Sequence, residues 1–445
     1  MKNNISQKER INNQKVEDVR EEFTGKNLTR FGGTGLIRRF FNRHSIREDI
    51  EKRIKVEGRR ECKYSVGSMI VSVLYGIFLG YQRPSQMEVF TTDGVFQKIA
   101  GLIGFPVQST ISRFLSSIKV SVAREFAILN FNFLMKFRGG FKAFKSITLD
   151  MDSHVIPVFG NQQMAGLGYN PKKKGRKSYH PILCFIGETR DYIGGFLRNG
   201  KHHTSHNAIP FIKSIIKKLP SHIKEIKVRA DSGFFSLDIL KFLINSAIEF
   251  YIVVPIQPWV QNKIMGIRNW RGIGYGVEVG EFEFILTKVI TIKMVVIRQK
   301  VKVGESPNKQ LKLLHVEGVV YDYQVIATNS NLSPEEVWRF YNKRANVENF
   351  IKEGIYGFGL DKVVSHSYAG NSTWFEVLMF AYNLMNFFKE EVMNQNKVKD
   401  MIQGIRERLF LIPGRLVYRG RQWILRLERT WFYRCEYEDA LTRVT

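Results

Sequence analysis

The pattern of hydrophobic and polar positions divides the chain into regions of different type. Residues 1–28 carry few apolar side chains among Asn, Gln, Lys and Glu, which predicts a disordered basic and polar arm. Residues 29–140 place apolar side chains mostly at helical spacing and are predicted to form a helical domain. Residues 411–445 combine many arginines with large apolar residues, and we expect an Arg-rich C-terminal tail there.

Residues 141–255 have the alternating pattern of strands, later interrupted by helical spacing. We expect strands at 146–160, 179–187, 192–200, 225–231 and 249–255, and helices at 207–219 and 236–247. Three strands in a meander followed by alternating helix and strand predict an α/β fold with a mixed sheet.

The next block, residues 256–330, is rich in β-branched and aromatic residues between Gly-containing turns. It predicts a β-rich insertion rather than a continuation of the helix–strand alternation. Helical spacing returns over residues 331–410, which we expect to form the second part of the same core.

The first helix of that second part has clear signals at both ends. Ser333 is expected at the N-cap, Pro334 at the first helical position and Glu336 in a capping box. Gly354 can end the helix, so one continuous helix is predicted over 331–354.

One apolar stretch, residues 64–82, carries no charge and is long enough to span a bilayer. Its serines and glycines fall on one helical stripe, which favours a packed helix of a soluble protein. Three widely spaced cysteines (Cys62, Cys184 and Cys435) form no Cys-x-x-Cys pair, which excludes a cysteine-built zinc site. With no secretory signal apparent, the chain is expected to be cytoplasmic and without a membrane partner.

The chain is strongly basic, because 68 basic and 41 acidic residues give a net charge of +27. Such a field attracts polyanions, and its spread along the chain favours nucleic acid over a membrane surface. Within the helical region, residues 96–118 resemble a helix-turn-helix, with Arg113 among the side chains placed to meet DNA. Two helices packed for stability are the alternative.

Three carboxylates are candidates for chemistry. Asp150 and Asp152 are two positions apart on the first strand, so both point to one face of the sheet. Asp231 ends the fourth strand, where Asp-Ser-Gly is also ordinary turn chemistry. Glu348 shares a buried helical stripe with Tyr341 and Arg344. For Asp150 and Asp152 the alternative is an edge strand whose charged face meets water. For Glu348 it is an ordinary ion pair with Arg344.

These segments, "TLDMDS", "VRADSGF" and "YNKRANVENF", resemble the signatures of the DDE transposases of bacterial insertion sequences, which have a ribonuclease H-like fold. The resembling branch carries a β-rich insertion before the catalytic Glu and a Tyr-x2-Arg-x3-Glu-x6-Lys signature. The family's last Lys would fall at Ile355, and Lys352 or Lys362 would have to substitute for it.

The resemblance implies that Asp152, Asp231 and Glu348 are catalytic and hold two Mg²⁺ or Mn²⁺ ions, with Asp150 as the alternative to Asp152. Tyr341 and Arg344 would bind DNA phosphates. The implied activity is binding of transposon ends, cleavage, and joining of the 3′-hydroxyls to target double-stranded DNA, by a homodimer near the bacterial nucleoid. The alternatives are a DNA-binding protein of the same fold without strand transfer, and a metal-dependent DNA nuclease.

Other polar segments are less specific. The basic loop at 171–177 is predicted to bind the DNA backbone through Lys172, Lys173, Lys174, Arg176 and Lys177, the alternative being a solvated loop. A zinc site at His202, His203 and His206 is disfavoured, because no acid or Cys nearby completes the ligand set. Trp259 and Trp270 are candidates for base stacking, although core packing is the favoured role.

Overall fold

The fold is described from a computed structural model of the chain. It describes residues 20–57, 62–168, 174–300, 312–316, 319–397 and 400–445.

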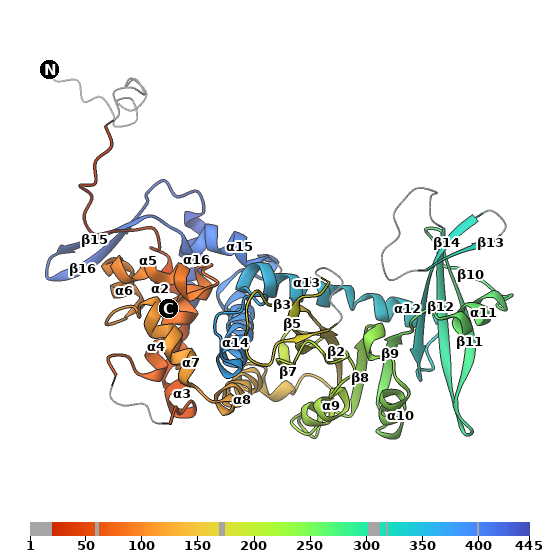
Figure 1. Cartoon of the computed structure of the whole chain (residues 1–445). Helices are drawn as coiled ribbons and strands as arrows, with labels where there is room; N and C mark the ends of the chain where they lie inside the picture. Colours follow the sequence, from red (N-terminus) through yellow and green to blue (C-terminus); the bar gives the residue numbers. More distant parts are fainter. Residues whose placement is uncertain (1–19, 58–61, 169–173, 301–311, 317–318, 398–399) are drawn as a thin grey trace, which may run out of the picture.

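The N-terminal region is helical, as predicted, and its last helix leads into the first strand of the central sheet (Figure 1). Its helices are α2 (Thr34–Arg43), α3 (Ile46–Arg53), α4 (Val66–Phe78), α5 (Val89–Thr92), α6 (Gly94–Ala100), α7 (Gln108–Ser117) and α8 (Val120–Phe137). The uncharged stretch at residues 64–82 contains α4, a helix of 13 residues. The Ser65 side chain caps its start by accepting a hydrogen bond from the backbone of Ser68. No helix within the described ranges is long and apolar enough to cross a membrane.

The centre of the molecule is a mixed sheet. Its core strands are β2 (Ser146–Ser153), β6 (Ile182–Ile186), β7 (Tyr192–Phe196), β8 (Glu225–Ala230) and β9 (Glu249–Val253), in the spatial order β9-β8-β2-β6-β7. The first three strands along the chain pair antiparallel, and β8 and β9 add in parallel through α9 (Ala208–Ile216) and α10 (Leu237–Asn245). The predicted mixed α/β sheet is therefore confirmed.

The first predicted strand is shorter than expected. It ends at Ser153, and the following residues join a separate small sheet of β3 (Ile156–Pro157), β4 (Gly166–Leu167) and β5 (Lys177–Tyr179).

The strands of the β-rich block continue the central sheet. It consists of α11 (Pro258–Met265), β10 (Arg271–Gly272), β11 (Val277–Thr287), β12 (Ile290–Lys300), β13 (Lys312–Val316) and β14 (Val319–Thr328). Strand β14 pairs antiparallel with β9, so these strands extend the central sheet to ten strands among the described residues. The reason is that β9 would otherwise be an edge with unpaired backbone groups.

The predicted helix over 331–354 is two helices. Helix α12 (Pro334–Asn342) begins with the expected Ser333–Glu336 capping box, and α13 (Ala345–Glu353) follows after a break at Lys343–Arg344. Gly354 does not end the second helix, because a π-helical turn continues over Gly354–Phe358 and ends at Gly359, whose φ is +79°.

The remaining elements close the core. Helix α14 (Tyr368–Val392) is buried along most of its 25 residues, beside α8 and β7. It is followed by α15 (Ile402–Ile405), a π-helical turn (Arg406–Phe410), β15 (Gly414–Arg419), β16 (Gln422–Leu427) and α16 (Arg434–Val444). The expected arm and tail meet, because β1 (Leu28–Thr29) pairs with β15.

Candidate active site

The first two candidate acids lie side by side because β2 and β8 are parallel neighbours. In their register Asp150 faces Arg229 and Met151 faces Ala230. Asp152 and Asp231 are each the next residue along, so both lie at the carboxyl ends of the strands. This edge is where open α/β sheets usually place their chemistry.

Asp150 is occupied by a structural ion pair. Arg229 Nε and Nη2 donate to its two oxygens at 2.6 Å each, and both side chains are buried. Burial raises the pKa of Asp150, and the Arg229 guanidinium opposes that rise. A Cβ at Gly187 would lie 2.6 Å from Arg229 Nη2, so the close packing around this pair depends on glycine there. Because both oxygens of Asp150 already accept from Arg229, Asp152 is the better candidate for the first catalytic acid.

Asp152 and Asp231 lie close enough for the charge of one to act on the other. Asp231 keeps partial access to solvent but lies deep among its neighbours. That burial, followed by the charge of Asp152, raises the pKa of Asp231 to about 6. Its Oδ1 also accepts a 3.1 Å hydrogen bond from the backbone of Gly233, so the turn role of Asp231 is real as well.

Arg344 supplies the positive charge at this pair. Its Nη2 lies 3.0 Å from Asp152 Oδ2 and donates to the carbonyl of Met151 at 3.3 Å. The same guanidinium lowers the pKa of Asp231, so it lies near both carboxylates. Two acidic side chains that need a cation between them are a donor set that fits a divalent metal ion.

Glu348 approaches the pair from α13, where it is exposed, and its charge contributes to the raised pKa of Asp231. Within the described ranges, no three His, Cys, Asp or Glu side chains are gathered closely enough to hold a metal ion. The structure thus brings Asp152 and Asp231 together and places Glu348 near them without completing a three-ligand set.

Tyr341 and Arg344, predicted to bind DNA phosphates, are turned towards the protein. Tyr341 is 7% exposed, belongs to a buried cluster with β-strand residues such as Val295, and donates to the carbonyl of Ala230 at 3.4 Å. Arg344 is 5% exposed. Of the two proposed substitutes for the family Lys, Lys352 is exposed and Lys362 is paired with Asp361 at 2.8 Å.

Two partners of the site were missed from the sequence. Arg229 alternates with apolar residues on its strand, but only the β2–β8 register shows that it faces Asp150. His180 is the second: its Nδ1 donates to the His202 carbonyl, and its Nε2 accepts from the Ser153 hydroxyl, both at 3.0 Å. Burial lowers the pKa of His180, consistent with this neutral tautomer. These hydrogen bonds hold the side chain of Ser153, the residue that follows Asp152.

The remaining DNA-binding candidates lie on exposed segments. Lys174, Arg176, Lys177 and Arg113 are exposed, and the guanidinium of Arg176 lies 4.8 Å from the ring centre of Phe159. Lys172 and Lys173 lie outside the described residues.

The alternative zinc and stacking residues have local roles. His202 and His206 stack with ring centres 4.0 Å apart. Trp259 packs against Phe284, and Trp270 lies under the Arg298 guanidinium at 4.0 Å.

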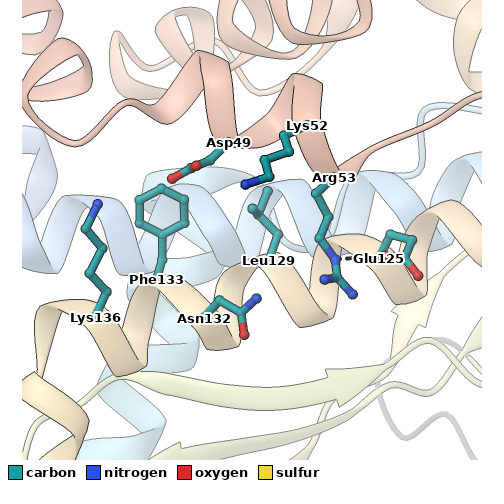
Figure 2. A pocket seen from close by; sticks show the side chains of 8 residues that line it. All are labelled: Asp49, Lys52, Arg53, Glu125, Leu129, Asn132, Phe133 and Lys136. Atoms are coloured by element: carbon teal, nitrogen blue, oxygen red, sulfur yellow. Dashed lines mark ion pairs between the residues drawn. The ribbon is translucent and has the colours of Figure 1, made fainter.

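A cavity of about 540 Å³ between α3 and α8 is separate from this site (Figure 2). The Arg53–Glu125 ion pair, at 2.8 Å, lies on one side of it, with Leu129 next to the pair and Phe133 farther along α8, near Asp49. None of the candidate catalytic carboxylates lines it.

An acidic pair at the carboxyl ends of a mixed sheet, in a chain of charge +27, is typical of enzymes that act on phosphodiesters. The family model described as "Transposase DDE domain group 1" matches residues 11–270 and 295–445. The chain therefore belongs to this transposase family and is a DDE-type DNA transposase, an enzyme class that generally uses divalent metal ions.

The solved structures similar to this chain include a piggyBac transposase in a synaptic complex with hairpin DNA. It shares 10% identity with a TM-score of 0.47, and the match covers 84% of this chain and 80% of that chain. No curated protein matches the sequence.

Proposed function

We propose that this transposase binds the ends of a bacterial insertion sequence, cleaves the DNA there and joins the freed 3′-hydroxyls to target DNA. The observation that supports this most is the Asp152–Asp231 pair, with Arg344 as its counter-charge, in a chain of the DDE transposase family.

In this proposal Asp152, Asp231 and Glu348 hold two Mg²⁺ or Mn²⁺ ions. When bound, such ions activate a water or a DNA 3′-hydroxyl and stabilise the leaving oxygen. Asp152 and Asp231 supply oxygens from rigid strand ends, and Glu348 supplies a third carboxylate from the first turn of α13. Asp150 stays with Arg229 and holds β2 and β8 together.

The protein groups around the acids would position the DNA. Arg344 and Tyr341 lie beside the carboxylates but are hydrogen-bonded to Met151 and Ala230. We infer that they turn from these partners to meet the phosphate next to the cut, Arg344 through its planar fork. Lys174, Arg176 and Lys177, with Lys172 and Lys173 of the same loop, would bind the DNA backbone, and Arg113 would contact DNA from α7. A homodimer acting in the bacterial cytoplasm would bring two transposon ends together.

The test is cleavage and joining of DNA that carries the flanks of the element, with Mg²⁺ and a second target DNA. Asp231→Asn is expected to bind this DNA as the wild type does and to give no cleavage, because one metal-holding carboxylate is lost. Normal cleavage by that variant would show that the site is assigned wrongly. Cleavage without joining by the wild type would instead identify a metal-dependent nuclease, and binding without cleavage would identify a DNA-binding protein.

A further inference from the structure

The C-terminal hairpin β15–β16 carries arginines on one face. In its register Arg415 lies opposite Arg426, and Arg419 lies opposite Gln422. Because side chains alternate along each strand, these four share a face with the pair Val417–Ile424 between them. All three arginines are exposed.

Within the described residues, this positive charge is not neutralised by an ion pair. Among the described residues, no carboxylate lies within 4.0 Å of Arg415, Arg419 or Arg426. Like charges placed directly opposite each other destabilise a strand pair, so the Arg415–Arg426 pairing works against the hairpin's own stability. By contrast, two arginines of the next element, α16, are each paired with an acid: Arg434 with Glu438 and Arg443 with Asp439.

The other face of the hairpin contacts the protein in part. Leu416 is buried opposite Leu425, whereas Tyr418 and Trp423, whose rings lie 5.0 Å apart, are 61% and 51% exposed. Lys98 of α6 lies 3.3 Å from the centre of the Trp423 ring. The strand β1 pairs with β15 as well, and Figure 1 shows the hairpin beside the N-terminal helices. Anchoring through one face directs the arginine face outward.

The tip adds a fourth arginine. Gly420 and Arg421 form the two-residue turn with φ values of +58° and +63°. Gly, Asn and Asp are the usual residues at such positions, because a positive φ crowds longer side chains. Arg421 is exposed there and has no carboxylate within ion-pair distance in the described part of the chain.

We propose that Arg415, Arg419, Arg421 and Arg426 form a second DNA-binding surface, separate from the acidic site. A two-stranded ribbon fits the major groove of duplex DNA, and guanidinium groups bind phosphates with two parallel hydrogen bonds. Duplex DNA would supply the counter-charge that these arginines lack among the described residues. The inference rests on the proposed function, which makes DNA the polyanion that this enzyme meets.

The test compares two double variants that each remove two positive charges from the C-terminal region. Arg415→Gln/Arg426→Gln changes the unpaired face, and Arg434→Gln/Arg443→Gln is the matched control on α16. Binding to a labelled duplex is measured by fluorescence anisotropy over a series of salt concentrations. We expect the first variant to bind at least about tenfold more weakly and its log–log salt slope to fall by about 2, since each phosphate contact contributes about 0.9. The control is expected to retain the wild-type slope.

Folding can be separated from binding in the same experiment. Removing the Arg415–Arg426 repulsion should leave the melting temperature of the full chain unchanged or raise it. Arg421→Asn keeps a residue suited to the turn and removes one charge, so it should lower the slope by about 1.

Two results would overturn the inference. The first is equal binding by the face variant and its control, which would leave the proposed function intact provided that the wild type binds DNA. The second is a face variant that changes the oligomeric state in sedimentation while binding DNA normally, which would make the face a contact between two copies. A wild type that binds no DNA would instead refute the proposed function itself.

Discussion

Two aspartates on one strand, Asp150 and Asp152, have the same chemistry and different surroundings. Asp150 is held by two 2.6 Å contacts from Arg229, whereas Asp152 shares Arg344 with Asp231. We infer that the first is a structural residue and the second a catalytic one.

Asp150→Asn is therefore expected to lower the free energy of unfolding by about 3–5 kcal/mol, because it leaves the Arg229 charge buried and uncompensated. Asp152→Asn should cost much less, since Asp231 remains beside Arg344 and loses a repelling neighbour. Urea unfolding of the two variants measures the difference. Equal losses, or a larger loss for Asp152→Asn, would contradict this division of roles.

A third acid, Glu376 on α14, lies away from the site and is expected to be neutral at physiological pH. Burial raises its pKa to about 8, and the Tyr192 hydroxyl donates to its Oε1 at 3.3 Å. Lys218 is the charged group that acts on it, with a smaller effect that lowers the pKa.

The folded protein thus holds a proton on Glu376 that an unfolded chain, with a pKa of 4.5, releases. Stability should fall as pH rises from about 5 to 8, by at most about 1.4 kcal/mol per pH unit from this residue. Glu376→Gln should remove this loss of stability. The difference in melting temperature between the variant and the wild type should therefore shift in favour of the variant as pH rises. Parallel pH profiles for the two proteins would refute the assignment of this proton.

At the scale of elements, local signals were predictable from the sequence and pairings between distant segments were not. The capping box placed the start of α12, and alternation placed β2 and β8. No breaker residue marks the kink at Lys343–Arg344. At this kink Arg344 points towards Asp152, and the two residues are 192 positions apart in the sequence.

The extended sheet was missed for the same reason. Strands β11 to β14 read as a separate insertion because nothing local shows that β14 completes the edge of β9. In the candidate site, the acids and Arg344 were identifiable from spacing, whereas Arg229 and His180 depend on register and loop packing.

One buried side chain joins the N-terminal helices to the catalytic half. Arg406 Nε donates to the carbonyl of Phe78 at 2.8 Å, and its Nη2 donates to those of Ile77 and Gly357 at 2.7 Å each. It therefore ties the end of α4 to the π-helical turn after α13.

Arg406→Leu should lower the free energy of unfolding by about 3 kcal/mol or more, because three buried carbonyls lose their donor. Guanidinium chloride unfolding measures this. Arg339→Leu is the control, since that arginine is exposed and its pair with Glu335 is worth less than about 1 kcal/mol. Similar small losses for both variants would show that Arg406 does not stabilise this junction.

At the scale of the whole molecule, the net charge of +27 is the dominant property. The paired arginines of the core and of α16 are neutralised locally, whereas those of the C-terminal hairpin have no ion pair in the described part of the chain. DNA affinity should consequently weaken at least about a hundredfold between about 50 and 200 mM salt, as counterions compete for the phosphates. Anisotropy titrations over that range measure the effect, and a flat response would contradict the charge argument.

We propose above that Asp152 and Asp231, completed by Glu348, hold the catalytic divalent ions. Titration of the full chain with Mn²⁺, followed by electron paramagnetic resonance, tests it without knowledge of the transposon ends. The wild type is expected to bind Mn²⁺, and Asp231→Asn to bind it at least about tenfold more weakly, because one carboxylate ligand is lost. Asp439→Asn, at an exposed acid on α16, should bind as the wild type does. Equal Mn²⁺ affinity for wild type and Asp231→Asn would contradict the account.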